Sequence, residues 1–489
     1  MNLYWVGGSG NWSDATNHWA TESGGTPHAD NLPTSSDDVY FDANSFDNVG
    51  QSVSLNNFGY ECHNMNWTGA TNNPTFKDGT LFLSGSLTFI EDMYVNNVED
   101  DDWVNIYLYA SGEEKTIQPA GQHWNLLLID TLYGPNDKWT LLGDLDVGYF
   151  DAYTGTFDAN DFDVSCEGFY LESWVDGEEE FYCTTYMGNG TWTIKEGVEG
   201  WYVAEYDNVE IPIYPENSTI VFSSPEKDFK GGGKEYNNVV FTVDFFMKDS
   251  NSFNDFTVDT PPRTIEIMAG TTQTIGGTPS IIGTDGNLIT IKSSPSNDER
   301  GYPNPADFTV IDIELVSNGD FTGDADGWDL GVGWSYGTDN IIHDTSAYGY
   351  IGQVFEVVAG KYYLVSYDVT ASSGVGGNTV FLGGATNSMG PQVVGSYQTV
   401  IYALTTAQFY FGASHGVTID NISVKECYIT AQHNISKPSG IVECDYLDLT
   451  NSNATGGATW YAGENSIDSG NNTGWIFTNR KDPLPGFRP

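Results

Sequence analysis

Two stretches of the chain, VNIYLYASGEEKTIQPAGQHWNLLLID (residues 104–130) and STIVFSSPEKDFKGGGKEYNNVVFTV (residues 218–243), follow the same plan. Each opens with an apolar strand, continues through a Lys-x-Ile or Lys-x-Phe strand, and turns at glycine. Each then resumes with an aromatic-Asn pair, Trp124-Asn125 or Tyr236-Asn237, and another apolar strand. Strands that recur every ~20 to 30 residues without intervening helices are typical of a solenoid, because each coil buries its apolar face only against its neighbours.

The composition supports a chain built from strands. There are 56 glycines, 29 tyrosines and 26 phenylalanines among the 489 residues. Aromatic residues favour strands, and frequent glycine favours the tight turns between them. We therefore expect an all-β fold whose main part is a β-solenoid, similar to a parallel β-helix. A β-sandwich with unusually regular strand spacing is the alternative.

The chain is strongly acidic: 67 Asp and Glu residues oppose 17 Lys and Arg, for a formal net charge of -50. Such a surface repels the phosphates of nucleic acids and anionic lipids. No segment approaches the ~20 consecutive apolar residues that span a bilayer. We therefore expect neither nucleic acid nor membrane as a partner. The acidity fits either a surface exposed to a saline medium or unselected drift in composition, and the sequence leaves both open.

The amino terminus has the features of a cap. Met1 runs directly into NLYWVGGSGNWSDATNHWA (residues 2–20), without a basic segment or an apolar core, so we expect no cleaved export signal. A solenoid needs its ends covered, and indole rings cover much apolar area. Trp475 and Phe477 are suited to the same role at the other end. The five scattered cysteines fit core positions better than a disulfide framework.

The stretch ELVSNGDFTGDADGWDLGVGWSYG (residues 314–337) differs from its surroundings, because it is rich in Gly, Asp and Trp. Beyond it, YYLVSYDV (residues 362–369) alternates apolar and polar positions as a half-buried strand does. GVTIDNISVKE (residues 416–426) has the pattern of a closing strand. Together these segments predict an independent β-sandwich inserted into the solenoid.

Several strings outside this insertion carry a resemblance. They begin at Tyr4 (YWVGGSGNWSDATNHWA), Cys62 (CHNMNWTGATNNPTF), Ala269 (AGTTQTI) and Cys444 (CDYLDLTNSNATGGATWYAG). With them, the chain resembles β-solenoid surface and virion proteins of environmental bacteria and their phages. The resemblance implies that the solenoid resumes after the insertion. We expect an N-terminal cap (1–50), a β-solenoid (51–301), an inserted sandwich (302–427), a solenoid continuation with a C-terminal cap (428–478) and an extended tail (479–489).

The inserted segment carries a second resemblance. The landmarks NGDF with GW, QVFEVVAGKYYLVSYDV and VTIDNISVKE occur in the order found in jelly-roll carbohydrate-binding modules, which are appended to glycoside hydrolases and to phage tail proteins. The resemblance implies a two-sheet sandwich that holds sugar against aromatic rings, with amide and carboxylate groups on the hydroxyls. The candidate residues are Trp334, Tyr336, Tyr348 and Gln353. A core position is the alternative for each aromatic residue.

Modules of this type often hold a structural calcium ion. The resemblance assigns it to Asp420 in the closing strand, and less securely to Glu314 and Asp320 near the NGDF turn. Ligation by oxygen alone suits Ca²⁺. An ordinary solvated carboxylate is the alternative at each of these positions.

The sequence contains no catalytic constellation. A polysaccharide lyase needs a basic side chain to take the proton, and we expect the solenoid to offer almost none. A glycoside hydrolase needs two carboxylates about 5 to 10 Å apart, and among 67 acidic residues neighbouring pairs carry no information. No HExxH, GxSxG or Walker A string occurs. We therefore expect a protein that is not an enzyme.

The closing segment is basic and rich in proline. It holds Arg480, Lys481 and Arg488, and its three prolines favour an extended conformation. A pre-extended basic strip loses little entropy when it binds an acidic surface, so it is a candidate docking peptide for a neighbouring subunit. An ordinary disordered tail is the alternative.

Together these features favour a phage virion structural protein, which is a fibre, a spike or a capsid decoration. The sandwich would bind host or environmental polysaccharide, and the rest of the chain would contact other capsid or tail subunits; homo-oligomers stay open. The expected location is the virion, assembled in the host cytoplasm. A bacterial cell-surface adhesin is the alternative, and a polysaccharide-degrading enzyme is the least favoured hypothesis.

Overall fold

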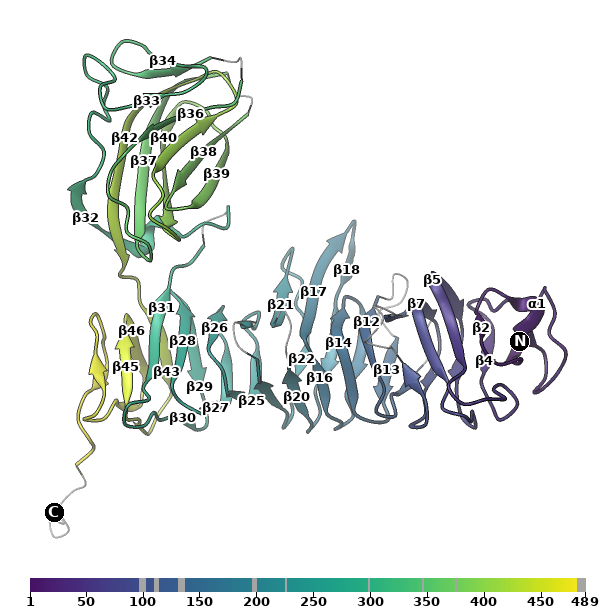
Figure 1. Cartoon of the computed structure of the whole chain (residues 1–489). Helices are drawn as coiled ribbons and strands as arrows, with labels where there is room; N and C mark the ends of the chain where they lie inside the picture. The colour runs from purple at the N-terminus through teal and green to yellow at the C-terminus, as the bar shows by residue number, and fades with distance from the viewer. Residues whose placement is uncertain are drawn as a thin grey trace, which may run out of the picture.

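The computed structural model describes residues 1–95, 103–109, 114–130, 137–195, 200–224, 227–297, 300–344, 347–373 and 376–481. Nearly all regular elements in these ranges are strands, and helix α1 (Ala15–His18) is a single turn. Two long, largely parallel sheets form one elongated body, and two antiparallel sheets form a second body (Figure 1). The predicted all-β solenoid with an inserted sandwich is confirmed. Within the described ranges, no helix has the length and apolarity needed to cross a bilayer.

The two repeated stretches of sequence fold alike, as successive coils. Two sets of three strands stack in parallel: β10 (Val104–Leu108), β12 (His123–Ile129) and β14 (Leu145–Ala152), then β23 (Thr219–Phe222), β25 (Glu235–Phe241) and β27 (Ser252–Val258). Asn105 lies opposite Leu126, and Leu126 lies opposite Tyr149. Alternate side chains therefore point into a shared core, because successive Cβ atoms of a strand point to opposite faces.

The longest sheet continues as two parallel ladders. β14 pairs with both β16 (Val164–Cys166) and β17 (Gly168–Asp176), so the chain bends between them. One ladder proceeds through β20 (Thr191–Ile194), β23, β25, β27, β29 (Thr272–Ile275), β43 (His433–Lys437) and β46 (Ser452–Gly456). The other proceeds through β21 (Trp201–Glu205), β24 (Lys227–Lys230), β26 (Phe245–Lys248), β28 (Arg263–Met268), β31 (Ile289–Ser294), β45 (Leu447–Thr450) and β48 (Ile467–Asp468).

A ten-stranded sheet covers the other side of the solenoid. It begins with β3 (Trp19–Ala20) and β1 (Asn2–Trp5), continues through β4 (Asp38–Tyr40) and ends at β22 (Ile213–Tyr214).

Aromatic residues fill the core of the solenoid. Its fully buried tryptophans are Trp5, Trp12, Trp19, Trp67, Trp124, Trp139, Trp192, Trp201 and Trp460. Several stack on phenylalanine, as Phe169 does on Trp201 with 4.0 Å between ring centroids. Burying one large apolar side chain contributes roughly 1.5 to 3 kcal/mol. All five cysteines are buried and free, as a core role predicts.

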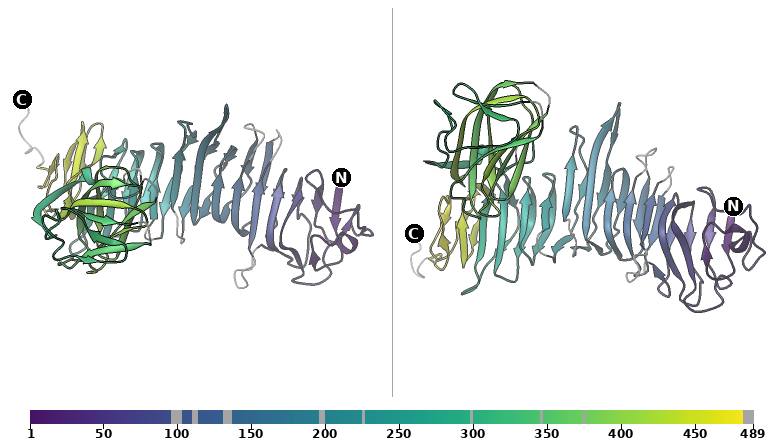
Figure 2. Two further views of the ribbon diagram at one scale, coloured as in Figure 1. Left: turned by 90° about the horizontal axis from the view of Figure 1, so that it is seen from above. Right: turned by 45° about the horizontal axis from the view of Figure 1, so that its top comes forward.

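The second body is an antiparallel sandwich with its own hydrophobic core. One sheet has the order β34 (Trp334–Tyr336), β35 (Ile341–His343), β42 (Val417–Ile429), β37 (Tyr362–Ser372), β40 (Gly395–Tyr402), and β32 (Phe308–Glu314) also pairs with β42. The other has the order β33 (Asp329–Leu330), β36 (Gly349–Gln353), β41 (Phe409–Ala413), β38 (Gly377–Leu382), β39 (Ala385–Pro391). Figure 2 shows the sandwich near the carboxyl-terminal end of the solenoid.

The solenoid ladders run without interruption past the inserted segment. Ile289 of β31 lies opposite Leu447 of β45, and Thr272 of β29 lies opposite Asn434 of β43. The main chain leaves and re-enters side by side through two paired strands, with Phe308 opposite Ile429. We call these paired ends of β32 and β42 the stalk.

Asp307 secures the foot of the stalk. Its carbonyl oxygen accepts hydrogen bonds from the amides of Thr430 and Ala431, and its carboxylate accepts two from Ser296. Backbone pairing and these bonds connect the departing chain to the returning chain.

Candidate functional site

Trp334 lies in the core of the sandwich. The residue is 6% exposed, and its ring centroid lies 4.8 Å from that of His343 and 6.1 Å from that of Phe411. A ring enclosed in this way cannot lie against a sugar. We therefore assign Trp334 to the packing of the two sheets and not to a binding surface.

Gln353 is also buried, and its side-chain amide is already bonded. Its Oε1 accepts a hydrogen bond from the amide of Ser317 at 2.7 Å, and its Nε2 donates to the Ser317 carbonyl at 2.9 Å. These bonds fasten β36 to the NGDF turn. A sugar hydroxyl would have to displace them, so we assign Gln353 a structural role.

Tyr348 lies on the exposed face of the five-stranded sheet, where the structure adds two tyrosines to it. Tyr348, Tyr350 and Tyr410 are 43%, 42% and 40% exposed. Ring centroids lie 4.8 Å apart for Tyr348 and Tyr350, and 6.5 Å apart for Tyr350 and Tyr410. We call these three residues the tyrosine platform. Tyr336 is exposed as well, but its hydroxyl bonds Asp339 beside β34, in the other sheet.

Glycines make room for the platform. A Cβ atom on Gly352 would lie 2.6 Å from the Tyr410 ring, and one on Gly412 would lie 2.7 Å from the Tyr348 hydroxyl. In register, Gly352 lies opposite Tyr410 and Tyr350 lies opposite Gly412. Large rings can therefore lie down over glycine on the neighbouring strand.

Polar groups border the platform. Asp329 lies opposite Gly352 in the next strand, and Thr379 lies opposite Gly412 on the far side. Ser388, in the edge strand β39, lies opposite Thr379. The rings suit the apolar face of a sugar, and the hydroxyl and carboxylate groups beside them can form hydrogen bonds with its hydroxyls.

The sequence interpretation missed Tyr350 and Tyr410, although a signal was present. In GYIGQ (residues 349–353) and FYFGA (residues 409–413), an aromatic residue and a glycine stand two positions apart, which places both on one face. The same pattern in two strands predicts rings lying over glycines. Only the pairing of β36 with β41 brings the two patterns together.

The other sheet carries a polar cleft of about 350 Å³, lined in part by Ser366, Asp368, Ser396, Gln398 and Asn421. Asp368 accepts a hydrogen bond from Ser396 Oγ at 2.5 Å and another from Asn421 Nδ2 at 2.8 Å. The groups that line this cleft are thus held by one another.

Carboxylates converge near the polar cleft. Partial burial raises the pKa of Asp420, and the neighbouring charges of Asp368, Asp320 and Asp339 raise it further. Of the expected calcium ligands, Asp420 and Asp320 are therefore close enough to interact. Among the described residues, however, no group of three or more His, Cys, Asp or Glu side chains is arranged to hold a metal ion.

Glu314 is occupied by other contacts. Its carboxylate accepts hydrogen bonds from the amides of Leu315, Val316 and Val424 and from Ser423 Oγ. These bonds tie β32 to β42 at the top of the stalk. Glu314 is thus placed as a clamp between strands, and a calcium ion would have to compete with four donors.

The expected docking tail is described only in part. Arg480 Nη1 lies 3.7 Å from Glu443 Oε2, and Lys481 is exposed. Arg488 lies outside the described residues, which end at 481. The docking role stays a prediction.

Comparisons with known proteins identify structural likeness only. No protein-family model and no curated protein matches the chain. A family 16 carbohydrate-binding module matches 22% of this chain and 98% of its own, with 17% identity and a TM-score of 0.18. An arabinose-bound α-L-arabinofuranosidase matches 31% of each chain, with 11% identity and a TM-score of 0.19. The enzymatically active domain of bacteriophage CBA120 tailspike protein 4 matches 77% of this chain and 64% of its own, with 14% identity and a TM-score of 0.20.

These comparisons overturn the expectation that the chain is not an enzyme, because two of these three similar structures are enzymes. The structure also corrects one reason for that expectation. Lysines are present on the solenoid, and Lys230, Lys248 and Lys292 lie at outward positions of β24, β26 and β31. At these TM-scores, neither likeness transfers an activity to this chain.

Proposed function

We propose that this protein is a structural component of a phage particle and binds polysaccharide through the tyrosine platform of its inserted sandwich. The observation that carries the proposal is the platform itself. Three half-exposed rings share one sheet face, glycines opposite them leave room, and hydroxyl and carboxylate groups border them. Aromatic rings in such surroundings suit the apolar face of a sugar.

The attachment of the sandwich supports presentation to a ligand. The stalk connects it to one end of an elongated solenoid, and Asp307 ties the two chain segments together. A binding surface held away from a rigid body can be repeated many times on one particle. Weak individual contacts would then add up to strong attachment.

A glycan array probed with the full-length chain tests the binding. We expect the wild-type protein to bind a subset of glycans and the Tyr350→Ala and Tyr410→Ala variants to lose about tenfold in affinity. Tyr428, which is exposed on the stalk, supplies the matched control Tyr428→Ala. Equal binding by all four proteins would contradict the role of the platform.

The place on a phage particle is tested separately. Mass spectrometry of purified particles from the host should detect this chain, and electron microscopy should locate a rod that carries a side domain. Detection on intact uninfected bacteria, with no particles present, would favour the adhesin instead. Release of reducing ends from the bound polysaccharide would add a catalytic activity to the binding.

A further inference from the structure

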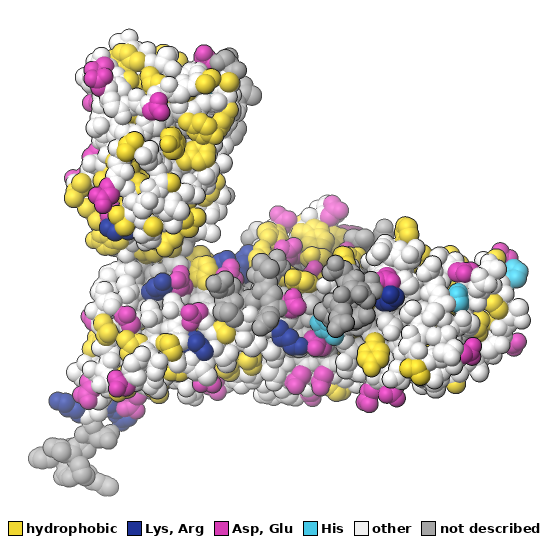
Figure 3. Space-filling model, viewed as in Figure 1, with side chains coloured by type: hydrophobic (Ala, Val, Ile, Leu, Met, Phe, Trp, Pro, Cys, Tyr) yellow, Lys and Arg dark blue, Asp and Glu magenta, His cyan; other side chains and the backbone are white. Residues whose placement is uncertain are grey.

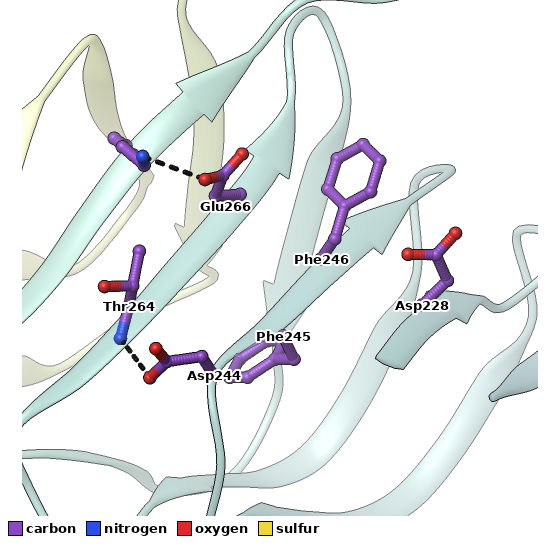
Figure 4. A pocket seen from close by; sticks show the side chains of 7 residues that line it. Asp228, Asp244, Phe245, Phe246, Thr264 and Glu266 are labelled. Atoms are coloured by element: carbon purple, nitrogen blue, oxygen red, sulfur yellow. Dashed lines mark hydrogen bonds and ion pairs between the residues drawn. The ribbon is translucent and has the colours of Figure 1, made fainter. Parts of the chain in front are cut away.

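A cleft of about 390 Å³ opens on the solenoid, in the ladder of β24, β26, β28 and β31. It is lined by Asp228, Asp244, Phe245, Phe246, Thr264, Glu266 and Lys292 (Figure 4). We call it the solenoid cleft. It lies outside the sandwich and shares no residue with the tyrosine platform.

One row of outward-facing side chains crosses the solenoid cleft. The parallel register places Asp228 opposite Phe246, Phe246 opposite Glu266, and Glu266 opposite Lys292. Neighbouring strands lie ~4.8 Å apart, a step comparable to the length of one sugar ring. The row therefore offers a different chemical group at each step along the solenoid.

Phe246 is the apolar member of this row. Its neighbour Phe245 points inward, where its ring centroid lies 3.4 Å from that of Phe241. Phe246 points outward, and Figure 4 shows its ring between Asp228 and Glu266. No apolar side chain lies beside this ring in the row, but Lys248 Nζ lies over it, 5.1 Å from the ring centroid. A ligand would therefore place its apolar face against the side of the Phe246 ring that faces away from Lys248.

Existing bonds hold the polar groups of the cleft in place. Glu266 Oε1 lies 2.8 Å from Lys292 Nζ, and Asp244 Oδ1 accepts a hydrogen bond from the Thr264 amide at 2.8 Å. Asp228 Oδ2 forms an ion pair with Lys248 Nζ, and these two atoms lie 2.5 Å apart. Each carboxylate keeps further lone pairs for hydroxyl donors. The entropy lost on binding is smaller because these side chains are already ordered.

The base of the sandwich lies beside this cleft. Burial raises the pKa of Tyr362 to about 12, and the largest electrostatic contribution comes from the Glu266 carboxylate. The Tyr362 ring centroid lies 4.9 Å from the centroids of both Phe308 and Tyr402. Figure 3 shows hydrophobic side chains gathered along the base of the sandwich, where it faces the solenoid. A ligand in the cleft thus has an aromatic cluster from the second body close by.

Charge decides the class of ligand. Three carboxylates and one lysine line the solenoid cleft, and the whole chain carries a net charge of -50. An anionic polymer would be repelled. We propose that the solenoid cleft is a second carbohydrate site, which takes a neutral, hydroxyl-rich polysaccharide segment with Phe246 against a sugar ring. This site does not depend on the tyrosine platform.

Affinity electrophoresis of the full-length chain tests the site. Native gels would contain glucan, mannan, galactan, arabinan or anionic polygalacturonate. We expect one of the neutral polymers to retard the wild-type protein, and Phe246→Ala and Glu266→Gln to weaken that binding about tenfold. Phe82→Ala is the matched control, because Phe82 is an aromatic residue at a partly exposed position of another solenoid strand, β7 (Thr75–Leu83). Thermal unfolding of each variant would verify that the solenoid stays folded.

The outcomes separate the two sites. Loss of binding in Phe246→Ala but not in Tyr350→Ala supports the solenoid cleft as the site for that polymer, and the glycan array still decides the role of the platform. The reverse result contradicts the cleft and leaves the platform intact. Retention of wild-type affinity by Phe246→Ala on every neutral polymer would overturn the proposal. Retardation of the wild type by polygalacturonate alone, or by no polymer, would overturn it too.

Discussion

The Nδ1 atom of His433 lies 2.9 Å from the Oγ atom of Ser293, although the whole inserted sandwich separates the two residues in sequence. Ser293 is in the last solenoid strand before the insertion, and His433 begins the first one after it. The Ser293 hydroxyl also accepts a hydrogen bond from the His433 backbone amide. It donates one to the carbonyl oxygen of Asn451 at 3.0 Å. This buried polar contact joins the two parts of the solenoid core.

Replacement of Ser293 should destabilise the solenoid. Ser293→Ala leaves the buried imidazole and amide of His433 without the hydroxyl, which costs roughly 1 to 3 kcal/mol of unfolding free energy. Urea unfolding followed by tryptophan fluorescence measures the change. Ser280→Ala is the control, because Ser280 is exposed in β30 (Pro279–Ile281) and should change stability by less than about 0.5 kcal/mol. Equal stability of the two variants would contradict a role for this contact.

His433 should make the solenoid sensitive to acid. Burial lowers its pKa from 6.5 to about 3, so the folded protein keeps the imidazole neutral while the unfolded chain binds a proton below pH 6.5. The unfolding free energy should therefore fall by up to about 1.4 kcal/mol per pH unit as the pH decreases from 6.5 towards 3. His433→Asn should lose this component, whereas His28→Asn, at an exposed position, should keep it. Urea titrations across this pH range measure the unfolding free energy. If it changes equally with pH in the wild type and in His433→Asn, the prediction is wrong.

Deletion of the sandwich should leave a folded solenoid. The ladders pair directly across the insertion, as Thr272 with Asn434 and Ile289 with Leu447. Replacing residues 302–427 with a short Gly/Ser linker adds little loop-closure free energy. We expect a monodisperse, elongated protein by small-angle scattering, with a β-rich circular dichroism spectrum. Aggregated or unfolded product would mean that the sandwich is integral to the solenoid.

Trp334 and Tyr350 should respond differently to alanine. Removing the buried Trp334 side chain leaves a cavity, and such substitutions cost about 3 to 5 kcal/mol. Removing the half-exposed Tyr350 ring should weaken glycan binding while stability changes by under about 1 kcal/mol. Calorimetry of both variants, combined with array binding, checks the pair of predictions. Wild-type stability in Trp334→Ala together with lost binding would restore Trp334 as a sugar contact.

Truncation after Thr478 should test the tail. The ion pair between Arg480 and Glu443 is exposed, so its loss should change stability by less than about 1 kcal/mol. If the tail docks on a neighbouring subunit, the truncated chain should fold but fail to enter particles. Mass spectrometry of particles from a strain that produces the truncated chain measures how much of the chain enters the particles. Normal incorporation would contradict docking and favour a tail without a partner.

The sequence alone determined the architecture of this protein. Repeated strand and turn patterns at 104–130 and 218–243 specify coils, because each short apolar strand can be buried only against the next. The shift to Gly, Asp and Trp at 314–337 marks the insertion. The tryptophans of the amino terminus and the scattered cysteines fit buried positions for the same reason, since large or apolar side chains leave water.

The tertiary structure decided which side chains remain free for function. Local alternation separates the two faces of a strand, but it does not say which face meets the core, and this depends on the sheet packed against it. Trp334 is therefore inside while Tyr350 is outside, although both lie in short strands that contain glycine or serine. In the same way, the sequence alone does not reveal a partner for the Glu314 carboxylate. The folded chain places β42 beside it, and the carboxylate then accepts a hydrogen bond from the Val424 amide. The solenoid cleft has no sequence motif, because its row from Asp228 to Lys292 exists only when four coils stack in register.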